Sequence, residues 1–226
     1  MINFSKELDT MKLAILSATK VSIEPIEYAF LQIDPNIEFF HLLDTSLLPM
    51  LKSEKGITPK IIQRFTKLID LAVSADAKAV LFTCSAFNDI TMILQPLYEI
   101  KLFRSDEAML TQATKYQKIG LVSTVAETSL VLEAYLKKLK PEIKIESAAD
   151  DGIIHLLERG KKEEHDERVR KMINQLKGKV DVIILSQYSI AHVKEQVSLD
   201  IPILTAPAAS AKQCVDYLRK LGDNEV

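Results

Sequence analysis

The stretch KLAILSAT at residues 12–19 decides the fold, because KIGLVSTV at residues 118–125 repeats its pattern. Each stretch is a continuous apolar run followed by hydroxyl side chains, as expected for a strand buried on both faces and the loop after it. A second pair, AVLFTC at 79–84 and VIILSQ at 182–187, is displaced by 103 positions, close to the 106 of the first pair. The two repeats predict two similar α/β halves of roughly equal length.

Apolar runs alternate with helical patterns along the rest of the chain. After Thr58 as N-cap and Pro59 at the first helical position, apolar side chains up to Ala72 fall on one stripe of an amphipathic helix. Strands that alternate with such helices form right-handed βαβ units in a mainly parallel sheet, whose ligands bind beyond the carboxyl ends of the strands. We expect strands at residues 13–16, 39–43, 79–82, 119–122, 182–185 and 201–204.

The predicted fold class is α/β, with two pseudo-symmetric parallel-sheet halves and the active site between them. Residues 1–104 together with 206–226 are expected to form the first half, because the last helix is predicted to return to it. Residues 105–205 are expected to form the second. Two halves that face each other would bring the strand end at Cys84 opposite the strand end at Gln187, with a cleft between them.

The composition is that of an ordinary globular protein, with 226 residues, 47% hydrophobic and 27% charged, and a net charge of -2. The densest charge run, residues 158–168, mixes both signs and lacks the basic face of a nucleic-acid binder, so we expect no nucleic-acid partner. The apolar run at 13–16 is too short for a signal core or a membrane span, and two cysteines fit a reducing compartment. A cytoplasmic protein without membrane contact is expected.

The two cysteines differ in their surroundings. Cys214 falls on the apolar stripe of the last predicted helix and is expected to be a small buried hydrophobe. Cys84 closes a buried strand just before the chain turns into a helix. Backbone N–H groups at such a point stabilise a thiolate and can also hold a carboxylate. Cys84 is therefore the candidate catalytic residue, with a second core cysteine as the alternative.

The ordered motifs around Cys84 resemble the aspartate/glutamate/hydantoin racemase superfamily over nearly the whole chain. The resemblance implies two pseudo-symmetric halves around the active site, no cofactor, a small carboxylate-bearing substrate and a homodimer. The motifs that carry it are TCSAF at 83–87, HLLD at 41–44, DEAM at 106–109, the strand and loop at 120–128, and ILSQYSIA at 184–191.

In two-cysteine members of that family, one thiolate removes the proton from the carbon next to a carboxylate, and the opposite thiol returns a proton on the other face. Cys84 matches the first cysteine, which implies that it is the base. Gln187 takes the second position, and an amide cannot exchange a proton as a thiol does.

Because Gln187 takes the place of the second cysteine, three functions remain possible. A single Cys84 would serve a decarboxylase, a lyase or a cis-trans isomerase of a small (di)carboxylic acid, with Gln187 orienting the substrate. Alternatively, His192 or His41 would supply the second proton and keep a racemase-like reaction. The third outcome is a non-catalytic protein that binds or senses carboxylates.

Hydroxyl groups near the predicted strand ends are candidates for binding the substrate, and the alternative role for each is that of a helix N-cap. No metal site is expected, because His165 and Asp166 lie in the charged run without spaced partners. No glycine-rich phosphate loop is present, so we expect no nucleotide cofactor. The candidate substrate-binding residues are Ser17, Thr19, Ser85, Thr124, Thr128, Gln187 and Ser189.

Overall fold

The computed structural model describes residues 11–224, apart from the side chains of Glu127, Ile154, Glu158 and Asn224. Within this part the chain forms two four-stranded sheets, ordered β2-β1-β3-β4 and β6-β5-β7-β8, and all paired strands run parallel. The second sheet repeats the order of the first. The predicted α/β class with two similar parallel-sheet halves is confirmed.

The repeated sequence stretches form the two central strands of each sheet. β1 pairs with β3 from Leu13 opposite Ala79, and β5 pairs with β7 from Ile119 opposite Val182. The first sheet consists of β1 (Leu13–Ser17), β2 (Phe39–Leu43), β3 (Ala79–Phe82) and β4 (Lys101–Phe103). The second consists of β5 (Lys118–Ser123), β6 (Lys144–Ala149), β7 (Val182–Leu185) and β8 (Ile203–Thr205).

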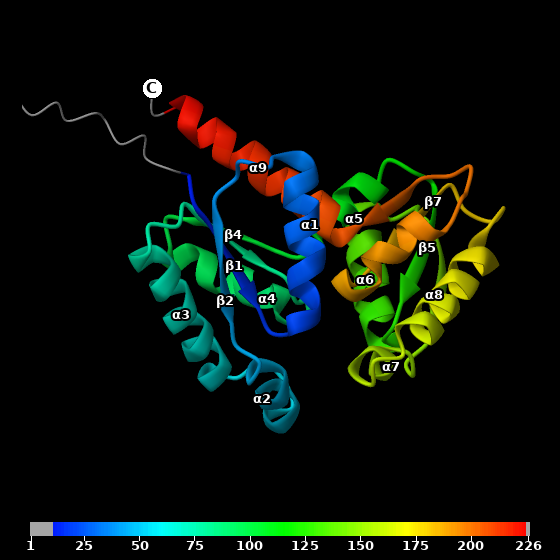
Figure 1. Ribbon diagram of the computed structural model, residues 1–226, viewed down its shortest axis with the longest axis horizontal. Coiled ribbons are helices and arrows are strands. Elements are labelled where there is room, and N and C mark those ends of the chain that lie inside the picture. The colour runs from blue at the N-terminus through cyan, green and yellow to red at the C-terminus, as the bar shows by residue number, and fades with distance from the viewer. Residues whose placement is uncertain (1–10, 225–226) are drawn as a thin grey trace, which may run out of the picture.

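Four helices lie between the two sheets and share one apolar core with them (Figure 1). Side chains from the inner faces of both sheets belong to this core, among them the fully buried Ile15 of β1 and Leu121 of β5. The two halves therefore pack through one continuous apolar layer. The four helices are α1 (Ile23–Ile33), α5 (Glu107–Ala113), α6 (Ala126–Leu139) and α9 (Ala206–Asn224).

Each sheet also has an outer core of its own. Helices α3 (Pro59–Ser74) and α4 (Asn88–Leu94) cover the first sheet, and α8 (Lys162–Leu176) covers the second. Both faces of the central strands are thus buried, which explains their uninterrupted apolar runs. The other helical segments are α2 (Leu47–Glu54), α7 (Ile154–Glu158) and the 3₁₀ turns η1 (Lys20–Ser22), η2 (Ser85–Phe87), η3 (Gln95–Leu97) and η4 (Tyr188–Gln196).

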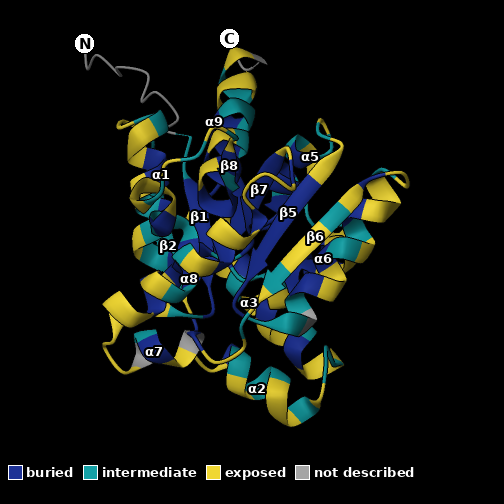
Figure 2. Cartoon of the chain, turned by 90° about the vertical axis from the view of Figure 1, so that its right-hand side faces the viewer, coloured by how far each residue is buried: buried dark blue, intermediate teal, exposed yellow. Residues whose placement is uncertain are grey.

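The strands expected from apolar runs are all present, with ends that differ by two residues or fewer. Two edge strands were not predicted: β4 has only three residues, and β6 is mostly exposed (Figure 2). The predicted helix after Thr58 begins at Pro59, although the Thr58 side chain makes no capping hydrogen bond. Among residues 11–224, no helix combines the length and the apolar character needed to cross a membrane.

Helix α9 contacts elements of both halves. It packs on α1 and β3 of the first sheet's half, and on α5, β8 and η4 of the other. The assignment of residues 206–226 to the first half therefore stays a prediction, as does the boundary at residue 104. Residues 1–10 and 225–226 of that predicted half lie outside the described residues.

A close approach at Gly120 gives a test of this packing. A Cβ atom on Gly120 would lie 3.0–3.2 Å from side-chain carbons of Leu176, Val180 and Ile183. We expect Gly120→Ala to lower the free energy of unfolding by about 1 kcal/mol or more through overpacking. Gly152→Ala is the matched control, because its nearest neighbour would be 3.6 Å away. Urea denaturation measures both, and equal stabilities of the two variants would contradict the packing described.

Candidate active site

The carboxyl ends of both sheets lie along one edge of the molecule, the lower edge in Figure 1. The turn η1, which follows β1, contacts η4, which follows β7. Loops from the two halves therefore meet at this edge. Ligands of open parallel sheets bind at such a place, beyond the carboxyl ends of the strands.

A chain of buried hydroxyl groups joins the strand ends of the first half. Ser17 Oγ lies 2.9 Å from Thr83 Oγ1, and Thr83 Oγ1 donates to Ser22 Oγ at 2.9 Å. Ser22 Oγ in turn donates to the carbonyl oxygen of Thr19 (2.9 Å). The Ser17 side chain is fully buried within this chain, whereas Thr19 remains partly exposed. Of these two candidates, Thr19 has the better access to a ligand.

Cys84 lies two residues after the end of β3 and is the N-cap of the 3₁₀ turn η2, with an extended backbone and a partly buried side chain. Burial raises the pKa of the thiol, and a hydrogen bond from the Ala86 N–H opposes that rise without cancelling it. The thiol is therefore protonated at neutral pH. Ser85, the next candidate, is partly buried beside it. The apolar side chains of Leu16, Ala18, Phe65, Phe82 and Phe87 pack around the thiol and leave no space there for a water molecule.

Gln187 stands at the corresponding position after β7, and its amide bonds within its own half. The Nε2 atom donates to Ser123 Oγ (2.8 Å). The Oε1 atom accepts from the Thr124 backbone N–H (3.2 Å) and from Ser186 Oγ (2.6 Å). These bonds tie the end of β7 to the end of β5. They leave one amide hydrogen of Gln187 for another acceptor.

The backbone N–H groups before and at the start of α6 also have internal acceptors. Besides Thr124, the Val125 N–H donates to Ser123 Oγ (3.2 Å), and the Ala126 N–H donates to a carboxylate oxygen of Asp151 (2.5 Å). An internal carboxylate thus occupies the end of α6 at which an anion is most favourable. Asp151 was not among the residues predicted from the sequence, because the strand before it, β6, was not predicted.

The remaining candidates lie near these loops. The Thr124 hydroxyl is buried and has no hydrogen-bond partner among the described residues. Thr128 is partly buried in the first turn of α6, and Ser189 is buried in η4. The structure thus links Thr124 directly to Gln187 and places the other candidates on the loops around them. Their roles in binding a substrate stay predictions.

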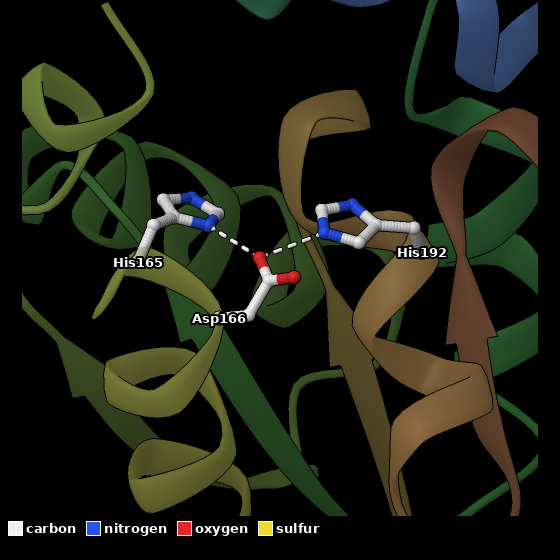
Figure 3. Close-up of side chains that lie close together, drawn as sticks. All are labelled: His165, Asp166 and His192. Atoms are coloured by element: carbon white, nitrogen blue, oxygen red, sulfur yellow. Dashed lines mark hydrogen bonds and ion pairs between the residues drawn. The ribbon is translucent and has the colours of Figure 1, made fainter. Parts of the chain in front are cut away.

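Both histidines considered for the second proton lie close to a carboxylate, although the His41 ring makes no hydrogen bond to a described residue. His41 Nε2 lies 3.0 Å from a carboxylate oxygen of Glu27, on α1. His192 Nε2 lies 2.7 Å from Asp166 Oδ1, on the outer helix α8, and His165 Nδ1 contacts the same oxygen at 2.8 Å (Figure 3). The sequence placed His165 and Asp166 in a charged run without partners. The structure adds His192 from 26 residues farther along the chain.

The comparisons with known proteins agree with this architecture. A family model described as Asp/Glu/Hydantoin racemase matches residues 47–214. No curated protein matched the chain. Many solved structures have a similar fold.

One of them is the glutamate racemase of Bacillus anthracis, with a TM-score of 0.72 and 18% identity, covering 95% of this chain and 84% of that one. An aspartate racemase of Picrophilus torridus has a TM-score of 0.73 and 15% identity, covering 92% and 94%. A mutant arylmalonate decarboxylase has a TM-score of 0.63 and 16% identity, covering 92% and 93%. At these identities the structures show the shared fold.

The raised pKa of the Cys84 thiol predicts how it reacts with iodoacetamide. Because the thiolate is the nucleophile, alkylation at pH 7 should be slower than that of a free thiol and should keep rising above the ordinary thiol pKa. Mass spectrometry after timed labelling measures the rate. Cys84→Ala is the control, since Cys214 is fully buried and its pKa is also raised. A rate that levels off below the ordinary thiol pKa would contradict the burial described for Cys84.

Proposed function

This chain belongs to the Asp/Glu/hydantoin racemase family, and we propose that it catalyses cofactor-independent proton transfer at a carbon next to a carboxylate, with Cys84 as the base. The observation that carries the proposal is the place of this thiol. It lies just beyond the carboxyl end of β3, packed among apolar side chains, and accepts a hydrogen bond from the Ala86 N–H. A small carboxylate-bearing molecule is the proposed substrate.

The Cys84 thiol is protonated at neutral pH, so it must lose its proton before it can act as the base, and burial then makes the thiolate a stronger base. A proton next to a carboxylate is a very weak acid, so it is removed by a desolvated base while hydrogen-bond donors hold the carboxylate as negative charge builds on it. Cys84 is surrounded by apolar side chains that exclude water. The neighbouring hydroxyl groups of Thr19 and Ser85 are the proposed donors of the first half. Ser17 supports them from within the buried hydroxyl chain.

The bonds of Gln187 favour a one-sided reaction. Two-base racemisation needs an acid on each face of the reacting carbon, and the Gln187 amide has no proton to exchange at neutral pH. Its bonds to Ser123, Thr124 and Ser186 hold it as a fixed donor instead. The second candidate function is therefore a single-cysteine decarboxylase, lyase or cis-trans isomerase of a small (di)carboxylic acid. Among the structures of similar fold, one is a mutant arylmalonate decarboxylase.

The first test asks whether Cys84 moves protons. The protein and its Cys84→Ala variant are incubated in deuterated water with amino acids, hydantoins and substituted malonates, and NMR follows deuterium incorporation and product formation. The native protein should label a substrate or product, and Cys84→Ala should do so about 10²–10⁴-fold more slowly. Cys214→Ala is the control for loss of the other thiol, and we expect it to retain activity. If the native protein neither incorporates deuterium nor forms a product with any compound of the panel, the result would favour a non-catalytic carboxylate-binding protein.

The second test uses Gln187→Cys, which places a thiol at the second position. With a prochiral malonate as substrate, we expect the native protein to protonate one face and to give one enantiomer in excess. Gln187→Cys should lower that excess toward zero, because a second proton donor then faces the carbon. Gln187→Ser is the matched control, since it also removes the amide without adding a thiol. Chiral chromatography measures the product, and a racemic product from the native protein would contradict a one-sided reaction.

A further inference from the structure

The strongest feature outside the proposed active site is the cluster of His165, Asp166 and His192 (Figure 3). One ligand atom from each residue, two imidazole nitrogens and one carboxylate oxygen, lies within 4.8 Å of the other two. Imidazole and carboxylate together are the usual ligands of Zn²⁺ and similar divalent cations. We propose that this cluster binds one such cation through His165 Nδ1, Asp166 Oδ1 and His192 Nε2.

The Asp166 carboxylate is oriented as a metal ligand would be. Its Oδ2 atom accepts from Lys162 Nζ (2.6 Å) and from Gln196 Nε2 (2.9 Å). Oδ1 is left to the two histidines, at 2.8 and 2.7 Å. Ligating carboxylates are commonly held in this way through their second oxygen. Lys162 also offsets part of the negative charge, so the site suits a cation whose affinity comes from its nitrogen ligands.

Burial and access fit a cation that enters from solvent. Asp166 and His165 are 2% and 0% exposed, whereas the His192 side chain is 32% exposed. The exposed side of the cluster gives the cation a route in and leaves the fourth position of a tetrahedral site for water. The two buried ligands come from neighbouring positions in the first turns of α8, and the third comes from η4.

Cation binding requires that the two nitrogens facing Asp166 Oδ1 present lone pairs to the cation. Without a cation, these nitrogens lie within hydrogen-bond distance of Asp166 Oδ1, at 2.8 Å for His165 and 2.7 Å for His192. With a cation, His192 carries its proton on Nδ1 and His165 carries its proton on Nε2, so that the nitrogens facing Asp166 present lone pairs. His192 is partly exposed, and water can accept its Nδ1 proton. The His165 Nε2 atom is buried and has no hydrogen-bond partner among the described residues in either case.

This proposal departs from the sequence-based expectation of no metal site. That expectation rested on ligand spacing along the chain, and the third ligand comes from a segment 26 residues away. The proposed cation joins α8 to η4, the segment that follows Gln187. The cation proposal does not rest on the proposed reaction, in which His165, Asp166 and His192 have no role, although His192 and the substrate-binding candidate Ser189 both lie in η4.

Calorimetry with Zn²⁺ tests the proposal. The full chain without a histidine tag carries Cys84→Ala, to remove the accessible thiol, and is freed of metal with a chelator. We expect one Zn²⁺ per chain. His192→Ala should weaken binding by at least the roughly 10- to 100-fold that loss of an outer-shell partner costs. His155→Ala, which removes an exposed histidine of α7, is the matched control and should bind as the parent does.

Side-chain NMR of ¹⁵N-labelled histidines gives a second measurement that does not depend on a variant. On addition of Zn²⁺, His192 should change to the form with its proton on Nδ1. Circular dichroism establishes that His192→Ala is folded before it is titrated. Absence of one-to-one binding by the parent would overturn the proposal, and so would equal affinity of His192→Ala and the parent. The cluster would then be a hydrogen-bonded network only.

Discussion

One apolar core shared by two sheets is the constraint on which the rest of the structure depends. The inner faces of both sheets and the four helices between them exclude water from a single layer, so neither sheet can shift without exposing apolar surface. That layer holds the sheets with their carboxyl ends along the same edge (Figure 1). The positions of Cys84 and Gln187 follow from it, because each residue lies two positions after the end of a central strand.

Sequence reasoning was accurate where burial alone determines the pattern. The central strands were found from their apolar runs, and β4 and β6 were missed because one is three residues long and the other is largely exposed. Cys84 could be singled out because a strand end is visible in the sequence. The partners of Gln187 could not, because Ser123 and Thr124 reach it across about 63 residues through hydrogen bonds that leave no periodic signal. The contact of His192 with Asp166 was missed for the same reason, because the two residues are 26 positions apart in the chain.

The two halves have the same strand order and differ in the side chains that follow their central strands. Ser17 and Ser123 end the first strand of each half, and each hydrogen-bonds to a residue at the end of the neighbouring central strand. In the first half the Cys84 thiol is packed among apolar side chains. In the second half the hydrogen-bonded arrangement includes the amide of Gln187, and the carboxylate of Asp151 lies on the start of α6. We infer that the first half supplies the reactive thiol and that the second supplies polar groups held in place by hydrogen bonds.

The position of helix α9 at the end of the chain affects how the protein folds during synthesis. It packs against α1, almost two hundred residues earlier in the sequence, and both helices belong to the core between the sheets. During synthesis α1 and the first four strands leave the ribosome long before α9 does, so only part of the inner face of the first sheet is covered in the nascent chain. Contacts this distant also slow folding, because a long loop must close before they form. The nascent first half is therefore the stage at which we expect chaperones to be most needed.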